Sequence, residues 1–216
     1  MSIVTNRRLP LWVKVAYSAF VAVVVPCYWV TYSPWNFLYF CDIALLVTGV
    51  AMWIESPLLV SMQAVAITLP QILWVVDFLC RLTAGVSITG VTAYMLDASI
   101  PLFLRALSLF HGWLPFVLLW LLSRLGYDRR ALGMQSALAI VVLFVSYLFA
   151  PSPPPSPSHP TWAVNINYVY GVDDNHPQTL MAPGLWLLLM MSVNVIAIYL
   201  PTHLMLRRFF KAPSSR

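Results

Sequence analysis

Charged residues are scarce in this chain of 216 residues: Asp, Glu, Lys and Arg together make up 9% of it. A soluble domain carries about 25% of such residues. Hydrophobic residues account for 61% of the chain, and its mean hydropathy is +0.82. This composition excludes an ordinary soluble domain and predicts an integral membrane protein that folds as one domain over residues 1–216.

The hydrophobic runs also lack the period-two alternation of a transmembrane barrel, so we expect helices. Six runs approach or exceed the ~20 residues that a spanning helix needs. They cover residues 11–32, 36–54, 57–79, 99–122, 130–150 and 183–206, with a Pro-rich outer loop at 151–182. The sequence therefore predicts an all-α fold, a bundle of six transmembrane helices.

Acidic residues number only seven against twelve basic ones, which leaves a net charge of +5. No basic amphipathic stripe accompanies this charge, so no nucleic-acid partner is expected. With six spans, ten of the twelve basic residues fall on one side of the membrane. These are Arg7, Arg8, Lys14, Arg124, Arg129, Arg130, Arg207, Arg208, Lys211 and Arg216. The positive-inside rule then predicts that both termini are cytoplasmic.

A signal peptide is not expected, because the first run is long and no A-x-A-like site follows it. The compact, charge-asymmetric chain favours a bacterial inner (plasma) membrane. Walker, dinucleotide-binding and HExxH patterns are missing as well, and there is no internal repeat. His159 and His176 lie near Asp173 and Asp174 at spacings that match no zinc motif, so neither a metal nor a cofactor is expected.

Three ionisable residues lie inside the hydrophobic runs: Asp42, Arg105 and His111. A charge there costs a few kcal/mol or more unless it faces a partner or a wet cavity, so such residues are usually functional. At about 1.5 Å per residue, Asp42 and Arg105 lie roughly 9 Å below the outer boundary and His111 about 18 Å below it. Asp77 is expected near that boundary, which places four ionisable groups in the outer half.

These groups allow two interpretations. Arg105 has Asp42 and Asp77 as plausible partners, in an ion-pair network that would fix helix register. Alternatively, the groups form a site: Arg105, Ser108 and His111 follow one another at i, i+3 and i+6 along one helix. Beside Gly112 and before Pro115, His111 is either a general base or a partner in an interhelical hydrogen bond.

Cys41 precedes Asp42 directly. Its thiol becomes a nucleophile if Arg105 or His111 stabilises the thiolate, and otherwise it is an inert buried cysteine. A disulfide between Cys27 and Cys80 is conceivable, and the sequence leaves it open. The amide side chains Gln63, Gln71 and Asn194 are expected to form interhelical hydrogen bonds.

Three short motifs occur in order along the chain: Phe40-Cys-Asp-Ile-Ala, Phe110-His-Gly-Trp-Leu-Pro and Asn165-Ile-Asn-Tyr-Val-Tyr. From residue 36 onward the chain resembles the YwaF-type bacterial membrane proteins and the transmembrane-164 acyltransferases. The androgen-induced-gene type lipid hydrolases are more distantly similar and have Thr in place of the Cys. That group often has a His just before the Cys-Asp pair, whereas this chain has Tyr39 and Phe40.

The resemblance implies acyl transfer or ester hydrolysis on a membrane lipid. Cys41 would be the nucleophile and His111 the general base, with Asp42 or Arg105 orienting them or stabilising charge. The candidate binding residues are Asp77, Ser108, Asn165, Asn167 and Tyr168.

The alternative is a non-enzymatic membrane protein, either a small transporter or a structural or accessory protein with a buried Asp-Arg-His network. Six spans without an inverted repeat argue against a carrier that acts as a monomer. A homo-oligomer could supply the missing pathway.

Overall fold

The computed structural model describes residues 9–213, and this part of the chain is helical, without strands. Its α-helices are α1 (Leu11–Tyr32), α2 (Phe40–Ile54), α3 (Pro57–Ala84), α4 (Leu102–Leu107), α5 (Phe110–Leu125), α6 (Ala131–Phe149), α7 (Pro183–Ser192) and α8 (Leu200–Phe209). A π-helix, η4 (Val193–Tyr199), joins α7 to α8. Three short 3-10 turns are η1 (Pro34–Leu38), η2 (Ala93–Leu96) and η3 (Ile166–Tyr168). The predicted all-α fold is confirmed.

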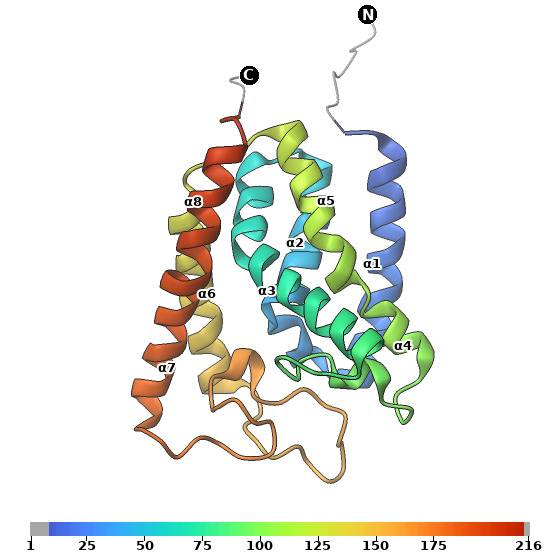
Figure 1. Cartoon of the computed structure of the whole chain (residues 1–216), viewed down its shortest axis with the longest axis vertical. Helices are drawn as coiled ribbons and strands as arrows, with labels where there is room; N and C mark the ends of the chain where they lie inside the picture. The colour runs from blue at the N-terminus through green and yellow to red at the C-terminus, as the bar shows by residue number, and fades with distance from the viewer. Residues whose placement is uncertain (1–8, 214–216) are drawn as a thin grey trace, which may run out of the picture.

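The chain runs along the bundle six times (Figure 1). Helices α4 and α5 share one pass, and α7, η4 and α8 share another. Both described chain ends lie at the same end of the bundle, called here the terminal end; the loops with η1, η2 and η3 form the opposite, loop end. Five passes are long and apolar enough to cross a membrane, while α2 has only 15 residues. The chain is thus a multi-pass membrane protein, and the cytoplasmic side of its termini remains a prediction.

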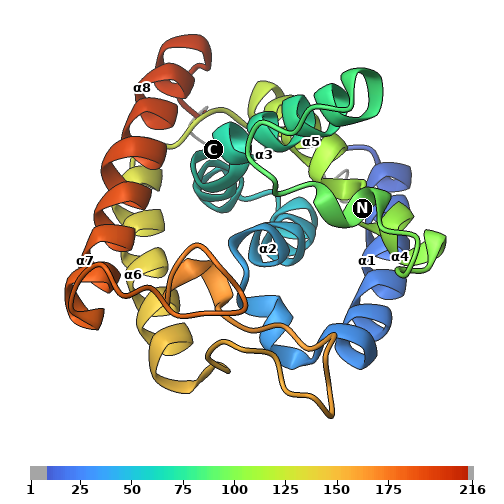
Figure 2. The ribbon, with the colours of Figure 1, turned by 60° about the horizontal axis from the view of Figure 1, so that its bottom comes forward.

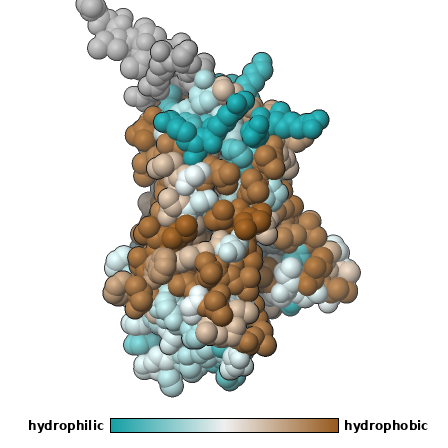
Figure 3. Space-filling model, turned by 90° about the vertical axis from the view of Figure 1, so that its left-hand side faces the viewer, coloured by the Kyte–Doolittle hydropathy of each residue, from teal (hydrophilic) through white to brown (hydrophobic). Residues whose placement is uncertain are grey.

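The surface agrees with this assignment. Large hydrophobic side chains such as Trp12, Phe116 and Leu148 are exposed, as expected where lipid rather than water surrounds the helices. On the face drawn in Figure 3, hydrophobic side chains cover the middle of the bundle, the most hydrophilic ones lie at the terminal end, and more weakly hydrophilic ones lie at the loop end. The helix bounds place basic residues at the terminal end, in the last turns of α5 and α8 and just before α6: Arg124, Arg129, Arg130, Arg207 and Arg208.

Helix α3 is the most enclosed pass and packs against α2, α5, α6 and the last pass. Seen from the loop end, α2 also lies inside the ring of other helices (Figure 2). The two are joined by a tight turn in which Glu55 is left-handed and the Ser56 hydroxyl accepts from the Leu59 amide at 3.3 Å. This cap, with Pro57 at the first helical position, starts α3.

The second pass begins later than the predicted residue 36. Pro34 initiates the turn η1 rather than the helix, and Tyr39 is extended, so α2 starts only at Phe40. The fourth pass is interrupted at Ser108 and Leu109, and His111 consequently lies in the first turn of α5. In the last pass Pro201 has no amide N–H, which disturbs the helical ladder next to η4.

Asp77 organises the loop that follows α3. Its carboxylate accepts from the backbone amides of Ile88 at 2.7 Å, Thr89 at 2.8 Å and Thr92 at 3.2 Å. The hydroxyls of Ser87 and Thr92 donate to it as well. A carboxylate that accepts so many bonds stabilises one loop conformation.

The interpretation in which Arg105 pairs with Asp42 or Asp77 is wrong. Its guanidinium donates to the Met95 carbonyl oxygen at 3.2 Å. Across residues 9–213 no ion pair joins Arg105 to Asp42 or Asp77. The break at Ser108 and the loop bound by Asp77 separate groups that straight helices would have placed together.

Replacing Asp77 by Ala should release this loop. We expect amide hydrogen exchange at Ile88, Thr89 and Thr92 to accelerate more than about tenfold, because these three amides lose their acceptor. Exchange measured by mass spectrometry on the detergent-solubilised protein would show it. The matched control is Asp97→Ala, which removes an acceptor of the Ser99 amide in the same loop and should leave residues 88–92 unchanged. Unaltered exchange in Asp77→Ala would contradict the assignment.

The Pro-rich segment 151–182 folds back across the loop end (Figure 2). Ala163 donates its amide to the Tyr32 carbonyl at 2.9 Å, and the Tyr39 hydroxyl donates to the Val164 carbonyl at 3.1 Å. Residues Val164–Asn167 are buried as a result. The segment therefore covers the loop end of the bundle.

Candidate functional site

Two cavities adjoin one another near the loop end. The first, called the loop-end cavity, has a volume of about 470 Å³ and lies under the folded-back segment. The second, called the apolar cavity, has about 330 Å³ and extends between α2, α3 and the last pass. Six residues line both cavities: Tyr39, Cys41, Trp74, Val91, His111 and Tyr168.

Helix geometry explains why Cys41 and His111 lie at one level. Cys41 is 13 residues from the end of α2, and His111 is 14 residues from the end of α5, both ends being at the terminal end. At about 1.5 Å per residue these separations are roughly 20 and 21 Å. The two antiparallel neighbours of α3 thus carry both residues to the same depth.

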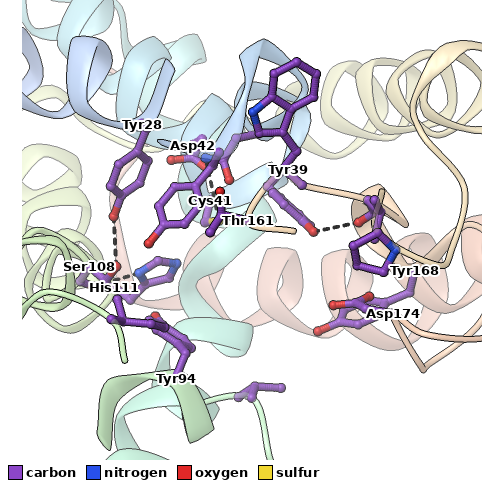
Figure 4. A pocket seen from close by; sticks show the side chains of 18 of the residues that line it. Tyr28, Tyr39, Cys41, Asp42, Tyr94, Ser108, His111, Thr161, Tyr168 and Asp174 are labelled. Carbon is purple, nitrogen blue, oxygen red and sulfur yellow. Dashed lines mark hydrogen bonds between the residues drawn. The ribbon is translucent and has the colours of Figure 1, made fainter. Parts of the chain in front are cut away.

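The imidazole of His111 is held in a defined orientation. Its Nδ1 lies 2.8 Å from the Ser108 carbonyl oxygen, which accepts only if Nδ1 carries the proton. The ring stacks on Trp74 with centroids 5.3 Å apart and planes at 20°. In this tautomer Nε2 keeps its lone pair, and the ring lies among the residues that line the loop-end cavity (Figure 4). His111 is therefore equipped to accept a proton there.

Ser108 completes this arrangement. Its hydroxyl lies 2.9 Å from the Tyr28 hydroxyl and 3.3 Å from the Leu104 carbonyl. The short break between α4 and α5 turns its backbone carbonyl toward His111. Ser108 thus orients the imidazole by its backbone and lines the loop-end cavity by its side chain.

Asp42 lies beside the Cys41 thiol. Consecutive helical side chains point about 100° apart, yet the Cys41 Sγ reaches within 3.9 Å of Asp42 Oδ2. Asn36 donates its side-chain amide to the same oxygen at 3.0 Å. Asp42 is 4% exposed, and its Oδ1 has no hydrogen-bond partner in the described part of the chain. The carboxylate thus retains a free acceptor oxygen at the site.

The Asn-Ile-Asn-Tyr motif anchors the helix that carries Cys41. Asn167 Oδ1 accepts from the Phe40 amide at 3.1 Å, and its Nδ2 donates to the Leu38 carbonyl at 2.8 Å. Asn165 instead fixes its own loop, donating to the Gly171 carbonyl at 2.9 Å. Both asparagines have positive φ, which Asn tolerates better than most residues. Asn167 is a cap of α2 supplied by a distant segment.

Of the predicted site residues, the loop-end cavity brings together Cys41, Asp42, Ser108, His111 and Tyr168. Asn167 lines the apolar cavity. Asp77, Arg105 and Asn165 line neither cavity. Their side chains form hydrogen bonds with the backbone of loop residues instead.

The sequence did not single out several other lining residues. The loop-end cavity is rich in tyrosine, with Tyr28, Tyr32 and Tyr94 beside the shared residues, and it includes Asp174 but no Lys or Arg. Burial raises the pKa of the Tyr94 hydroxyl, and desolvation also raises that of the Asp174 carboxyl. Tyr94 is thereby kept a neutral hydrogen-bond donor. No sequence signal marked these tyrosines, because aromatic residues near the ends of membrane spans are ordinarily interfacial anchors.

The histidines outside this site have other surroundings. His203 is buried at the terminal end with its Nδ1 2.6 Å from the Tyr127 hydroxyl. His159 stacks on Trp162, and His176 pairs with Asp173 at 3.2 Å, both in the outer loop. Cys27, Cys41 and Cys80 are free thiols. Within residues 9–213, no three His, Cys, Asp or Glu side chains gather as a metal site would require.

Fold and cavities together define a multi-pass helical membrane protein with a buried polar site at one end of its bundle. Comparisons of the chain with protein-family models, curated proteins and solved structures found no match. The resemblance to the YwaF-type and transmembrane-164 proteins accordingly stays a prediction.

Proposed function

We propose that this protein is a membrane-embedded lipid acyltransferase or lipid ester hydrolase in which Cys41 is the nucleophile and His111 the general base. The observation that supports the proposal is that both residues line both cavities. The apolar cavity suits an acyl chain, and the loop-end cavity suits the polar part of a lipid. An ester held across the two would have its carbonyl carbon at their junction.

The reaction follows from these positions. His111 Nε2 accepts the thiol proton while Cys41 Sγ bonds to the ester carbonyl carbon. The carbonyl oxygen takes the displaced electron pair and returns it as the ester C–O bond breaks. The leaving alkoxide takes the proton from the imidazolium, which leaves a thioester on Cys41. A second hydroxyl compound or water, deprotonated by His111, then attacks the thioester carbonyl carbon. The Cys41 thiolate leaves and takes the proton from the imidazolium, which restores both residues.

The non-enzymatic alternative is less well supported. It rests on a buried Asp-Arg-His network, and Arg105 neither pairs with Asp42 nor lines the cavities that contain His111. A structural or transport role would also give no use to the Nε2 lone pair of His111, whose ring lines the same cavities as Cys41.

The test is to find which cysteine becomes acylated. The purified full chain in lipid nanodiscs is incubated with para-nitrophenyl hexadecanoate, an activated ester with a long acyl chain. Peptide mass spectrometry then reads Cys27, Cys41 and Cys80 separately. We expect a hexadecanoyl thioester, cleaved by neutral hydroxylamine, on Cys41 alone, because of the three cysteines Cys41 is the one that shares both cavities with His111.

Cys27 and Cys80 serve as internal controls, since they are partly buried thiols in the same protein. Equal acylation of all three cysteines would show unspecific chemistry and would refute the proposal. Absence of any adduct on Cys41, together with no release of para-nitrophenol above the Cys41→Ala protein, would refute it too.

A further inference from the structure

Gln71 is a buried amide without a partner. Its side chain is 2% exposed, and neither Nε2 nor Oε1 has a hydrogen-bond partner among the described residues. Leaving such a group unpaired in a protein interior is unfavourable, because the amide loses its bonds to water and gains none in return. The interhelical hydrogen bond expected for Gln71 is not formed. A ligand in the cavity could supply the missing bonds.

The apolar cavity is where that side chain lies. Gln71 lines it together with Cys41, His111 and Trp74. Gln71 is 14 residues from the start of α3, hence about 21 Å from the terminal end, at the depth of Cys41 and His111. Trp74, one turn along α3, is the residue on which His111 stacks. Three helices thus bring a thiol, an imidazole and an unpaired amide to one level.

The backbone at this point adds a second unpaired group. Pro70 has no N–H, so the carbonyl of Ala66 one turn earlier lacks its helical donor. Ala66 and Pro70 line the same cavity. The cavity is otherwise lined mainly by apolar side chains such as Ile67, Val193 and Ile198. Gln71 is thus an amide in a mainly apolar lining that also contains Cys41 and His111.

We propose that the Gln71 amide donates a hydrogen bond to the acyl carbonyl oxygen of the lipid and stabilises the oxyanion that forms when Cys41 attacks. This inference rests on the proposed acyl transfer and names the group that binds the reacting carbonyl. An amide already in place needs no reorganisation, and in a dry cavity its dipole acts on the developing charge without screening. The acyl chain beyond the carbonyl occupies the apolar cavity.

Two reagents separate this role from a structural one. Para-nitrophenyl hexadecanoate transfers an acyl group and passes through an oxyanion. Hexadecyl methanethiosulfonate carries the same chain length and transfers an alkylthio group to the thiol, with methanesulfinate leaving and no carbonyl involved. Both rates at Cys41 are measured by mass spectrometry on the full chain in nanodiscs, for wild type and Gln71→Met.

We expect Gln71→Met to slow acylation by about 10²–10³-fold, the usual loss for one oxyanion donor, and to leave the thiosulfonate rate within about twofold. Met is similar in length to Gln and suits an apolar helix, so folding should be preserved. Gln71→Asn, which keeps the amide but shortens its reach, is the second variant and should lose part of the acylation rate.

Gln63 provides the matched control. It is also fully buried on α3, and its amide is likewise unpaired among the described residues, but it lines neither cavity. Gln63→Met should leave both rates unchanged. Acylation at the wild-type rate in Gln71→Met, or an equal loss with both reagents, would overturn the inference. Failure of wild-type Cys41 to react with the ester at all would instead refute the proposed function.

Discussion

His111→Ala is expected to slow acylation of Cys41 by about 10²–10⁴-fold, the usual contribution of a positioned general base. The structure supplies the reason. Ser108 accepts the Nδ1 proton at 2.8 Å, Trp74 holds the ring by stacking, and Nε2 is left as the acceptor. Without the imidazole, the thiol proton has only the Asp42 carboxylate, 3.9 Å from Sγ, as a nearby acceptor.

The rate is read as hexadecanoyl adduct on Cys41 against time, with the same ester and nanodiscs. His203→Ala is the matched control, because His203 is also buried, at 6% exposure, but binds Tyr127 at the terminal end. It should leave the rate unchanged. A rate in His111→Ala within about threefold of wild type would exclude His111 as the base.

Lys14→Met is expected to lower the free energy of unfolding by about 3–5 kcal/mol, the cost of breaking a buried ion pair from one side. Lys14 Nζ lies 2.8 Å from Glu55 Oε1, and the two side chains are 2% and 8% exposed. The pair joins α1 to the turn between α2 and α3, where the Leu9 amide also donates to Glu55 at 3.3 Å. Met removes the ammonium and leaves a carboxylate in an apolar setting.

Unfolding in detergent, followed by circular dichroism, measures this effect. Arg130→Met is the control, because its partner Asp128 is bound at 2.7 Å on the surface with Arg130 73% exposed, and surface pairs contribute little. The double variant Lys14→Met with Glu55→Leu should recover much of the loss, since both charges of the buried pair are then replaced by apolar groups. If the Lys14→Met protein were no less stable than the Arg130→Met protein, the ion pair between Lys14 and Glu55 would not stabilise the fold.

Some features of the candidate site could be predicted from the sequence, and others could not. That Cys41, Asp42 and His111 lie in the same half of the bundle could be predicted, because helix rise converts position into height once the spans are assigned. Their relative depth could not. The sequence placed His111 about 9 Å deeper than Asp42, whereas the structure puts Cys41 and His111 at one level, because α2 starts only at Phe40 and α5 only at Phe110.

The pairing of Arg105 could not be predicted either. It depends on the break at Ser108 and on how Asp77 binds the loop after α3, and both are local departures from straight helices.

The hydrogen bonding of Gln71 is a second feature that could not be predicted from the sequence. An amide in a spanning segment is ordinarily an interhelical hydrogen-bond partner, and the sequence predicts that role. Whether a partner is present depends on which side chains reach it across the packed interface. The structure places Gln71 at a cavity with its amide unpaired, and only that placement makes it a candidate for binding substrate.

From the sequence alone, the all-helical membrane fold could be predicted, with helix ends close to the observed ones. The position of most basic residues at one end of the bundle could be predicted as well. These follow from local physics, since long apolar runs must be helical in lipid and charges stay out of it. Tertiary structure alone decided that Asn167 caps α2 across 127 residues, that segment 151–182 covers the loop end, and that two cavities meet at Cys41 and His111. Loop paths and cavities arise from contacts between distant segments, and no local pattern of hydrophobicity records them.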